Sequence, residues 1–364
     1  MGVKHVIPCA NGTDALQIAM MGLDLKHGDE VITADFTFAA TVEVIALLQL
    51  TPVLVDVDMN NMNISLDGIR KAITSKTKAI VPVHLFGRAA NMDAIMEIAK
   101  EHNLYVIEDN AQAIGAKYTF KDGTLKSTGT IGHIGTTSFF PSKNLGCYGD
   151  GGAMFTNDDK IAKNLKMIAN HGQQVKYYHK VTGCNSRLDS IQAAILNIKL
   201  NHLDSYSFSR NKMAKNYDEN FSDIQELSIP KRQQNSTHVF HQYTLKIVPE
   251  LRNALIKFLK ENKAMKEFIS EKNTQIKSLE VQLNFKNNEL MSLRNKNEAF
   301  IQSQKKAKSY ISQSVDTYKK EINYLEKLLK EKQDLINGMT MKYENKKYHR
   351  LFRGNSSITF AREL

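Results

Sequence analysis

The chain has 364 residues, 42% of them hydrophobic, which is enough to bury a large core and is usually divided between two domains. Its three cysteines, Cys9, Cys147 and Cys184, lack the spacing of zinc ligands or of a disulfide framework, so we expect no metal site and a reducing, cytoplasmic location. The formal charge of +11 does not indicate nucleic acid, because residues 250–347 supply most of it, with 21 Lys/Arg interspersed among 13 Asp/Glu as on a solvated helix. We therefore expect no nucleic-acid partner. No apolar run is long enough to span a bilayer, so we expect no membrane partner either.

The first element predicted along the chain is a helix that runs to Met21 and opens with Asn11-Gly12-Thr13-Asp14-Ala15-Leu16. Backbone N–H groups at the start of a helix, together with the Thr13 hydroxyl, can hold a phosphate group. A capped surface helix explains the same residues. The motif alone therefore leaves both interpretations open.

Short apolar runs then alternate with helical patterns. Strands are predicted at residues 30–33, 52–56, 79–83 and 104–109, and a helical pattern covers Met92 to His102. This alternation is typical of a mainly parallel sheet with both faces covered, in which ligands bind at the carboxyl ends of the strands. Asp109 stands at such an end.

A lysine follows between a predicted strand and a glycine-rich turn, in the run from Ser138 to Gly152. Lys143 and Asp109 are the pair that a pyridoxal phosphate enzyme needs, because the cofactor takes a lysine amine for its Schiff base and a carboxylate for its pyridine nitrogen. Ser138 is either a further phosphate ligand or a polar strand residue. Phe38 either stacks on the cofactor ring or packs in the core.

Heptads replace this alternation after residue 264. One register has Ile269, Ile276, Leu283 and Leu290 at a positions with Leu279 and Leu293 at d positions, and a second has Val315, Ile322, Leu329 and Ile336 with Ile311, Tyr318 and Leu325. Both registers predict a coiled coil or a long helical hairpin. Lys272, Lys286 and Asn297 at core positions weaken the first seam, which favours a helix that depends on a coiled-coil partner.

Residues 2 to about 248 resemble the DegT/DnrJ/EryC1/StrS sugar aminotransferases, a fold-type-I pyridoxal phosphate family. The resemblance rests on six motifs: Gly12-Thr13-Asp14-Ala15-Leu16, Asp35-Phe36-Thr37-Phe38, His84-Leu85-Phe86-Gly87, Glu108-Asp109-Asn110-Ala111-Gln112, Ser138 through Gly152, and Asn185-Ser186-Arg187-Leu188-Asp189 followed by Gln192-Ala193-Ala194. It implies an aspartate aminotransferase-like α/β domain with a mainly parallel sheet, followed here by the long α-helical coiled coil.

The resemblance also implies a role for each site residue. The catalytic residue would be Lys143, and the residues that bind pyridoxal 5'-phosphate would be Gly12, Thr13, Phe38, Asp109, Gln112, Ser138 and Asn185. Asn185 would reach the phosphate in a neighbouring subunit, so a homodimer is implied. Arg187 is either a contact for an anionic substrate or a member of a structural ion pair.

The implied activity is the transfer of an amino group from glutamate to a keto-sugar nucleotide, with a UDP-linked 3-keto acetamido sugar or its uronic acid as the closest match, for surface polysaccharide synthesis. Relatives that dehydrate instead carry histidine in place of the lysine, and this chain keeps Lys143. The alternative is an inactive, truncated or fused remnant that serves as a coiled-coil oligomerisation module.

The chain departs from the family pattern at both ends. Family members carry a segment before the stretch equivalent to Gly2-Val3-Lys4-His5, and their small domain continues where this chain changes to heptads. We therefore expect an incomplete small domain. The predicted division is a cofactor-binding domain at 1–200, a partial small domain at 201–263, a coiled coil at 264–347 and an unassigned tail at 348–364.

Overall fold

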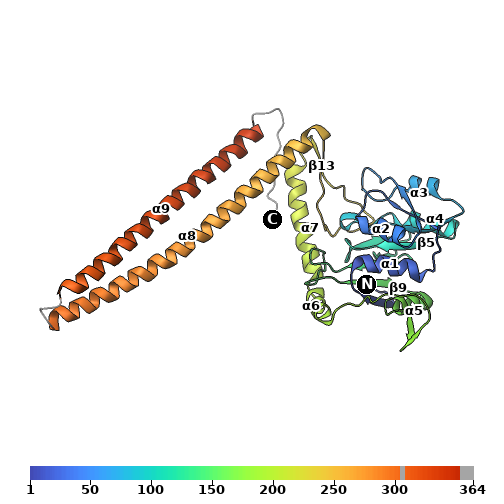
Figure 1. The fold of residues 1–364 in the computed structure, drawn as a ribbon. Helices are drawn as coiled ribbons and strands as arrows, with labels where there is room; N and C mark the ends of the chain where they lie inside the picture. Colours follow the sequence, from blue (N-terminus) through green and yellow to red (C-terminus); the bar gives the residue numbers. More distant parts are fainter. Residues whose placement is uncertain (304–307, 353–364) are drawn as a thin grey trace. The chain divides into compact units, whose positions relative to one another are not determined.

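The computed structural model describes residues 1–303 and 308–352, and the chain folds as two compact units (Figure 1). Unit 1 comprises residues 1–223 and 228–246, and unit 2 comprises residues 224–227 and the chain from residue 247 onward. Within the described ranges, no helix has both the length and the apolar character that crossing a membrane requires.

Unit 1 is built on a seven-stranded sheet with the strand order β1-β9-β8-β5-β4-β2-β3. The strands are β1 (His5–Cys9), β2 (Glu30–Ala34), β3 (Thr51–Val55), β4 (Thr77–Val81), β5 (Tyr105–Asp109), β8 (Ile134–Ser138) and β9 (Gly152–Thr156). Pairing is parallel from β3 through β2, β4 and β5 to β8, and β9 runs antiparallel to both β8 and β1. The prediction of a mainly parallel sheet is confirmed.

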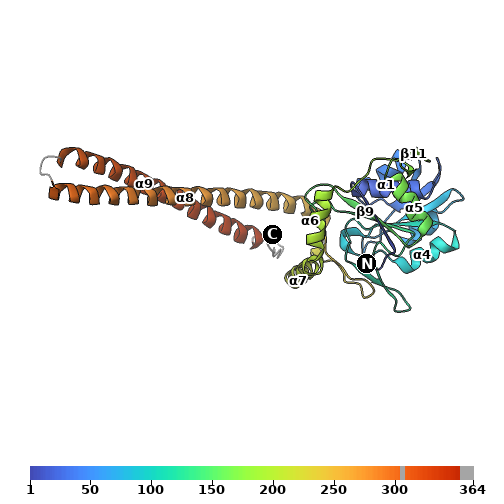
Figure 2. The same cartoon turned by 90° about the horizontal axis from the view of Figure 1, so that it is seen from below.

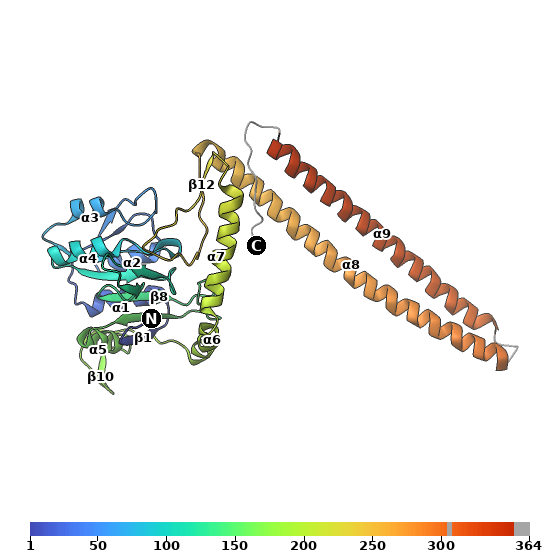
Figure 3. The ribbon, with the colours of Figure 1, turned by 180° about the vertical axis from the view of Figure 1, so that it is seen from behind.

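The sheet is buried on both faces, and the apolar side chains of its inner strands are divided between two cores. Val31, Val81 and Ile107 pack into one core, whereas their neighbours Ile32 and Ile80 pack into the other. The first core is completed by α1 (Gly12–Gly22), α2 (Ala39–Leu47) and α5 (Asp159–Ile168), and the second by α3 (Leu66–Ala72) and α4 (Met92–Glu101). Figure 3 shows α3 and α4 on one side of the sheet and α5 on the other.

Shorter elements complete this unit and the connection to the next. They are η1 (Leu85–Gly87), β6 (Lys117–Thr119), β7 (Leu125–Ser127), β10 (Gln173–Val175), β11 (Tyr178–His179), α6 (Ser190–Leu200), α7 (Leu203–Phe221), β12 (Leu227–Ser228) and β13 (Lys246–Ile247). The predicted strand at 79–83 ends earlier, at Val81, because Pro82 has no N–H to donate to a ladder. Val83 instead forms an isolated parallel bridge with Asp109.

Unit 2 contains two long helices, α8 (Pro249–Ser303) and α9 (Lys308–Phe352), which pack against each other as an antiparallel pair (Figure 2). Leu290, Val315 and Ile322 are buried together, with Leu283, Leu293 and Tyr318 packed against them. The predicted helical C-terminal part is thus confirmed, and a coiled coil in the strict sense stays a prediction. The side chain of Ile311 and residues 353–364 of the predicted tail lie outside the described residues.

Candidate active site

The candidate site begins at the carboxyl end of β5, where Asp109 is only 5% exposed. Its carboxylate accepts hydrogen bonds from the Thr41 hydroxyl at 2.9 Å and from the Ala111 backbone N–H at 3.1 Å. A buried carboxylate needs such donors, since desolvation without them is costly. The two bonds fix the side chain at the sheet edge where α/β proteins bind ligands.

Lys143 lies on the loop that follows β8 and is half-buried. Burial lowers the pKa of its amine below the ordinary value of 10.5, and the negative charge of Asp109 opposes that decrease. The two residues that the sequence singled out are therefore close enough to interact electrostatically. A lysine with a lowered pKa holds more of its neutral, nucleophilic form at a given pH.

Gly12 and Ser138 meet where the start of α1 approaches the end of β8. A Cβ added at Gly12 would lie 2.6 Å from the Ser138 Cβ, so only glycine fits this contact. The helix is capped by the Asn11 side chain, which accepts a hydrogen bond from the Asp14 N–H at 2.8 Å. The half-buried Thr13 follows in the first turn. Gly12 and Thr13 therefore lie at a helix N-terminus, which favours anions, and Ser138 lies beside it at the end of β8.

Gln112 and Phe38 occupy different environments near this edge. The Gln112 side-chain oxygen accepts a hydrogen bond from the Phe86 N–H at 2.6 Å, which ties the residue to η1. Phe38 is 68% exposed at the N-cap of α2, so core packing within this chain does not account for it. Its stacking on a cofactor ring stays a prediction.

Asn185 and Arg187 are exposed and lie on the segment that precedes α6. Asn185 forms a bridge with Asn170, and the Arg187 guanidinium donates to the Asn170 side-chain oxygen at 3.3 Å. Among the described residues, neither side chain is hydrogen-bonded to Lys143, Asp109 or Ser138. Their roles at the phosphate and the substrate stay predictions.

His241 is a candidate that sequence reasoning missed. Its Nδ1 is 3.1 Å from the side-chain oxygen of Asn144, the residue after Lys143, and the Asn144 amide donates to the Val239 carbonyl at 3.1 Å. Burial, followed by the positive charges of Lys143 and Arg210, lowers the pKa of His241 to about 4. A neutral imidazole therefore lies near the lysine. No periodic or glycine-rich pattern marks this segment, so the sequence carried no signal for it.

Ser186 also escaped notice although it lies between two predicted site residues. It is buried, its hydroxyl donates to Asp14 at 2.6 Å, and it accepts from the Ala10 N–H at 2.9 Å. These bonds hold the segment of Asn185 and Arg187 against the start of α1. The sequence indicated Ser186 only by its position between Asn185 and Arg187 in the motif.

The residues present fit pyridoxal phosphate. The glycine–serine contact leaves backbone N–H groups and a hydroxyl for a phosphate, a buried carboxylate stands at the end of β5, and a half-buried amine lies within its electrostatic range. No cluster of three or more His, Cys, Asp or Glu side chains that could hold a metal ion is found in the described parts of the chain.

The sheet, the lysine and the carboxylate together fit the class of pyridoxal phosphate enzymes to which aminotransferases belong. The chain belongs to the DegT/DnrJ/EryC1/StrS aminotransferase family, whose model matches residues 1–289. It is 50% identical over 262 residues to a Geobacillus stearothermophilus "pleiotropic regulatory protein", covering 71% of this chain and 68% of that one. It is 47% identical over 247 residues to the UDP-2-acetamido-2-deoxy-3-oxo-D-glucuronate aminotransferase of Pseudomonas aeruginosa, covering 68% and 67%.

Solved structures agree. A family aminotransferase from Brucella abortus is 42% identical, with a TM-score of 0.65 over 68% of this chain and 67% of that one. NtdA from Bacillus subtilis, solved with bound cofactor PMP, is 32% identical, with a TM-score of 0.64 over 70% and 57%. The predicted family, fold and cofactor class are confirmed. The chain spans about two thirds of the length of the curated relatives described above.

Proposed function

We propose that this protein is a pyridoxal phosphate-dependent transaminase that moves an amino group from glutamate to a keto-sugar nucleotide. The observation that carries the proposal is the Lys143 amine, whose pKa is lowered by burial within electrostatic range of Asp109. Family membership supports the reaction class. Pyridoxal phosphate, when bound, supplies an electron-withdrawing ring that makes the substrate Cα–H bond acidic.

The protein's own residues position and move protons. Asp109, held by Thr41, would keep the ring nitrogen protonated, and Gly12, Thr13 and Ser138 would bind the phosphate. The Lys143 Nζ, as a neutral amine, would take a proton from the substrate Cα and deliver it to the cofactor carbon on the other side of the amino nitrogen. The exposed Phe38 side chain would confine the cofactor ring on one side, and Gln112, which is hydrogen-bonded to η1, would confine it on the other.

The substrate is proposed to be a UDP-linked 3-keto acetamido sugar or its uronic acid, a precursor of surface polysaccharide. Support comes from the Pseudomonas aeruginosa relative, whose substrate is of this kind. Arg187 is exposed, and its only partner among the described residues is an amide oxygen, so its charge is available to an anionic substrate. We place the reaction in the cytoplasm because the three cysteines are free thiols.

A homodimer is proposed because the single chain leaves part of the site open. Phe38, Phe140 and Tyr148 are exposed aromatic side chains on the segments that surround Lys143. A second copy could cover them and bring its Asn185 to the phosphate.

We also propose a division of the chain into a cofactor-binding region at 1–200, a partial small domain at 201–263 and a coiled-coil region at 264–347.

The test is titration of purified protein with pyridoxal phosphate, followed by borohydride reduction and peptide mapping. We expect a visible absorbance band, a covalent mass increase on the Lys143 peptide, and a spectral change on adding glutamate. Lys143→Ala should lose all three, and Lys160→Ala, an exposed lysine of α5, should keep them. A protein that shows no band would favour the alternative, an inactive coiled-coil module.

A further inference from the structure

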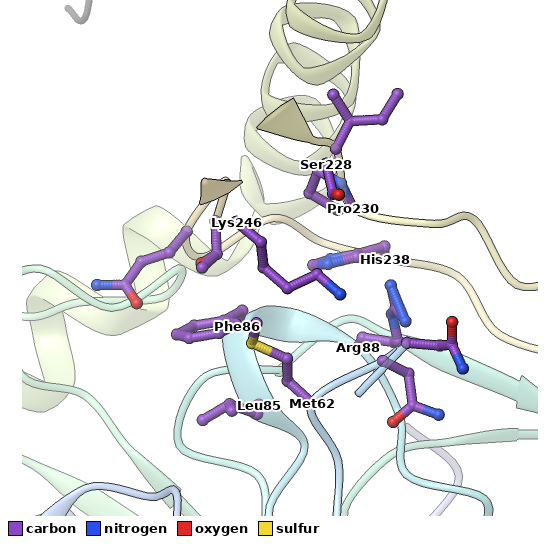
Figure 4. A pocket seen from close by; sticks show the side chains of 13 residues that line it. Met62, Leu85, Phe86, Arg88, Ser228, Pro230, His238 and Lys246 are labelled. Carbon is purple, nitrogen blue, oxygen red and sulfur yellow. The ribbon is translucent and has the colours of Figure 1, made fainter. Parts of the chain in front are cut away.

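A pocket lies in unit 1, between the chain around η1 and the segment 228–246, which is called the returning segment below (Figure 4). Met62, Phe86 and Pro230 form an apolar wall, and Arg88 and Lys246 supply two positive charges. Among the described residues that line this pocket there is no carboxylate. The balance of charge therefore favours an anion.

Arg88 provides the main reason to expect a ligand. The side chain is only 5% exposed, and its Nη2 donates to the Lys231 carbonyl at 2.5 Å. Its Nη1, in contrast, is buried without a hydrogen-bond partner among the described residues. Since an unpaired buried donor on a charged group is costly, this atom requires a partner.

The groups around Arg88 offset its charge only in part. Burial and the charge of Arg232 lower the Arg88 pKa, and the charge of Asp58 opposes them. Asp58 is already bonded to the backbone N–H groups of Asn60 and Asn61 at 2.8 and 3.1 Å. Burial, then Arg88 and Arg232, lowers the pKa of the adjacent His238 to about 3, so this ring adds no charge.

Lys246 offers further donors on the opposite side of the pocket. Its ammonium donates to the Met59 carbonyl at 2.5 Å, and an ammonium has three hydrogens. Two hydrogens are left for a ligand. Figure 4 shows Lys246 and His238 descending from the returning segment toward Arg88, which lies on the opposite wall.

We propose that this pocket is an oxyanion site, in which a phosphate or carboxylate group bridges Arg88 Nη1 and Lys246 Nζ. A planar guanidinium and an ammonium facing each other suit such a group, because charged donors form the stronger hydrogen bonds to anionic oxygens. The bound phosphate or carboxylate can be a free ion, or it can belong to a larger molecule whose apolar part contacts the apolar wall. The site does not depend on the activity proposed for Lys143.

The experiment measures inorganic phosphate binding by 31P NMR line broadening at constant ionic strength, on protein saturated with pyridoxal phosphate. With the cofactor in the proposed phosphate site at α1 and unbound cofactor removed, added phosphate reports on the Arg88 pocket. Arg88→Met should weaken binding by about tenfold or more, as loss of a charged hydrogen bond does. Arg70→Met, which removes an exposed arginine paired with Glu101, should bind like wild type.

Lys246→Met is the second variant, because Arg88→Met also removes the bond to Lys231 and its fold must be verified by circular dichroism. Lys246→Met should weaken phosphate binding with the fold retained. Competition by UDP, with the same dependence on Arg88, would assign the site to the phosphate of a nucleotide, and phosphate binding without competition would assign it to a free anion. Either outcome supports an oxyanion site. Unsaturable binding, or equal affinity in wild type and both variants, overturns it and leaves water as the partner of Nη1.

Discussion

At the scale of single residues, the state of the Lys143 amine depends on two opposed influences. Burial favours the neutral amine, and the Asp109 carboxylate favours the ammonium form. Removing the charge with Asp109→Asn should therefore lower the pKa of Lys143 further. The pKa can be followed in cofactor-free protein as the pH dependence of reductive 13C-methylation at Lys143.

Asp67→Asn is a suitable control for this measurement, because Asp67 lies in the first turn of α3 and does not act on Lys143. It should leave the Lys143 titration unchanged. A titration that is equally unchanged in Asp109→Asn would show that the two site residues do not interact, and the proposed pairing would fail.

His241 gives a prediction on pH. Its pKa is about 4 in the folded chain, against about 6.5 in an unfolded chain. Between these values the unfolded state binds more protons, so stability falls as the pH decreases from about 6.5 to about 4. The loss is on the order of 3 kcal/mol for a shift of this size. His241→Gln should reduce this acid-dependent loss in urea unfolding measured across that range.

His238 has a similarly lowered pKa, so the variant should retain part of the acid sensitivity. His27→Gln is the matched control, because His27 is an exposed histidine. If the free energy of unfolding falls equally with decreasing pH in wild type and His241→Gln, His241 has the same pKa in the folded and unfolded states, and the prediction is wrong.

Lys143 and Asp109 could be predicted from sequence because each stands next to a recognisable element, one before a glycine-rich turn and the other at a strand end. His241 and Arg88 could not. Their importance depends on burial by segments distant in sequence, as in the bridge between Arg88 and His238. Neither segment has a period that would have indicated that contact.

At the scale of elements, most predicted strands and helices agree with the structure to within a residue or two. The strand 104–109 and the helix 92–102 appear as β5 at 105–109 and α4 at 92–101. The antiparallel pairing of β9 with β1 and β8 could not be foreseen, since strand neighbours far apart in sequence are chosen by the packing of the whole sheet. The heptads predicted helices, but not that α8 begins as early as Pro249.

Gly338 provides a prediction for one helix. It lies inside α9, and a Cβ added there meets no atom within 4 Å. Glycine in a helix costs about 1 kcal/mol relative to alanine, so Gly338→Ala should stabilise α9 by roughly that amount. Native-state hydrogen exchange of α9 amides measures the gain. Gly12→Ala, where the new Cβ would clash with Ser138, should show the opposite sign in unit 1.

At the scale of the whole molecule, the chain joins a sheet unit with an extensive core to a helical unit with a narrow one. The interface of α8 and α9 includes a polar cluster, in which Lys286 is 3.6 Å from Glu321 and the Tyr318 hydroxyl donates to Glu289 at 2.8 Å. Such groups add little stability at a partly exposed seam but can fix the register of two helices. The stability of the pair must therefore come mainly from its few buried apolar residues.

Leu290 tests this conclusion. It is 8% exposed and packs with Val315 and Ile322, whereas Val281 on the same helix is 68% exposed. Leu290→Ala should lower the stability of the helical pair by about 2–5 kcal/mol, the usual cost of a core truncation, and Val281→Ala should change it by less than about 0.5 kcal/mol. Hydrogen exchange of α8 and α9 reports both values, with the amides of β2 and β4 as an internal reference. Equal, small effects of the two substitutions would mean that α8 and α9 are not held together by the buried seam, and that their pairing requires another partner.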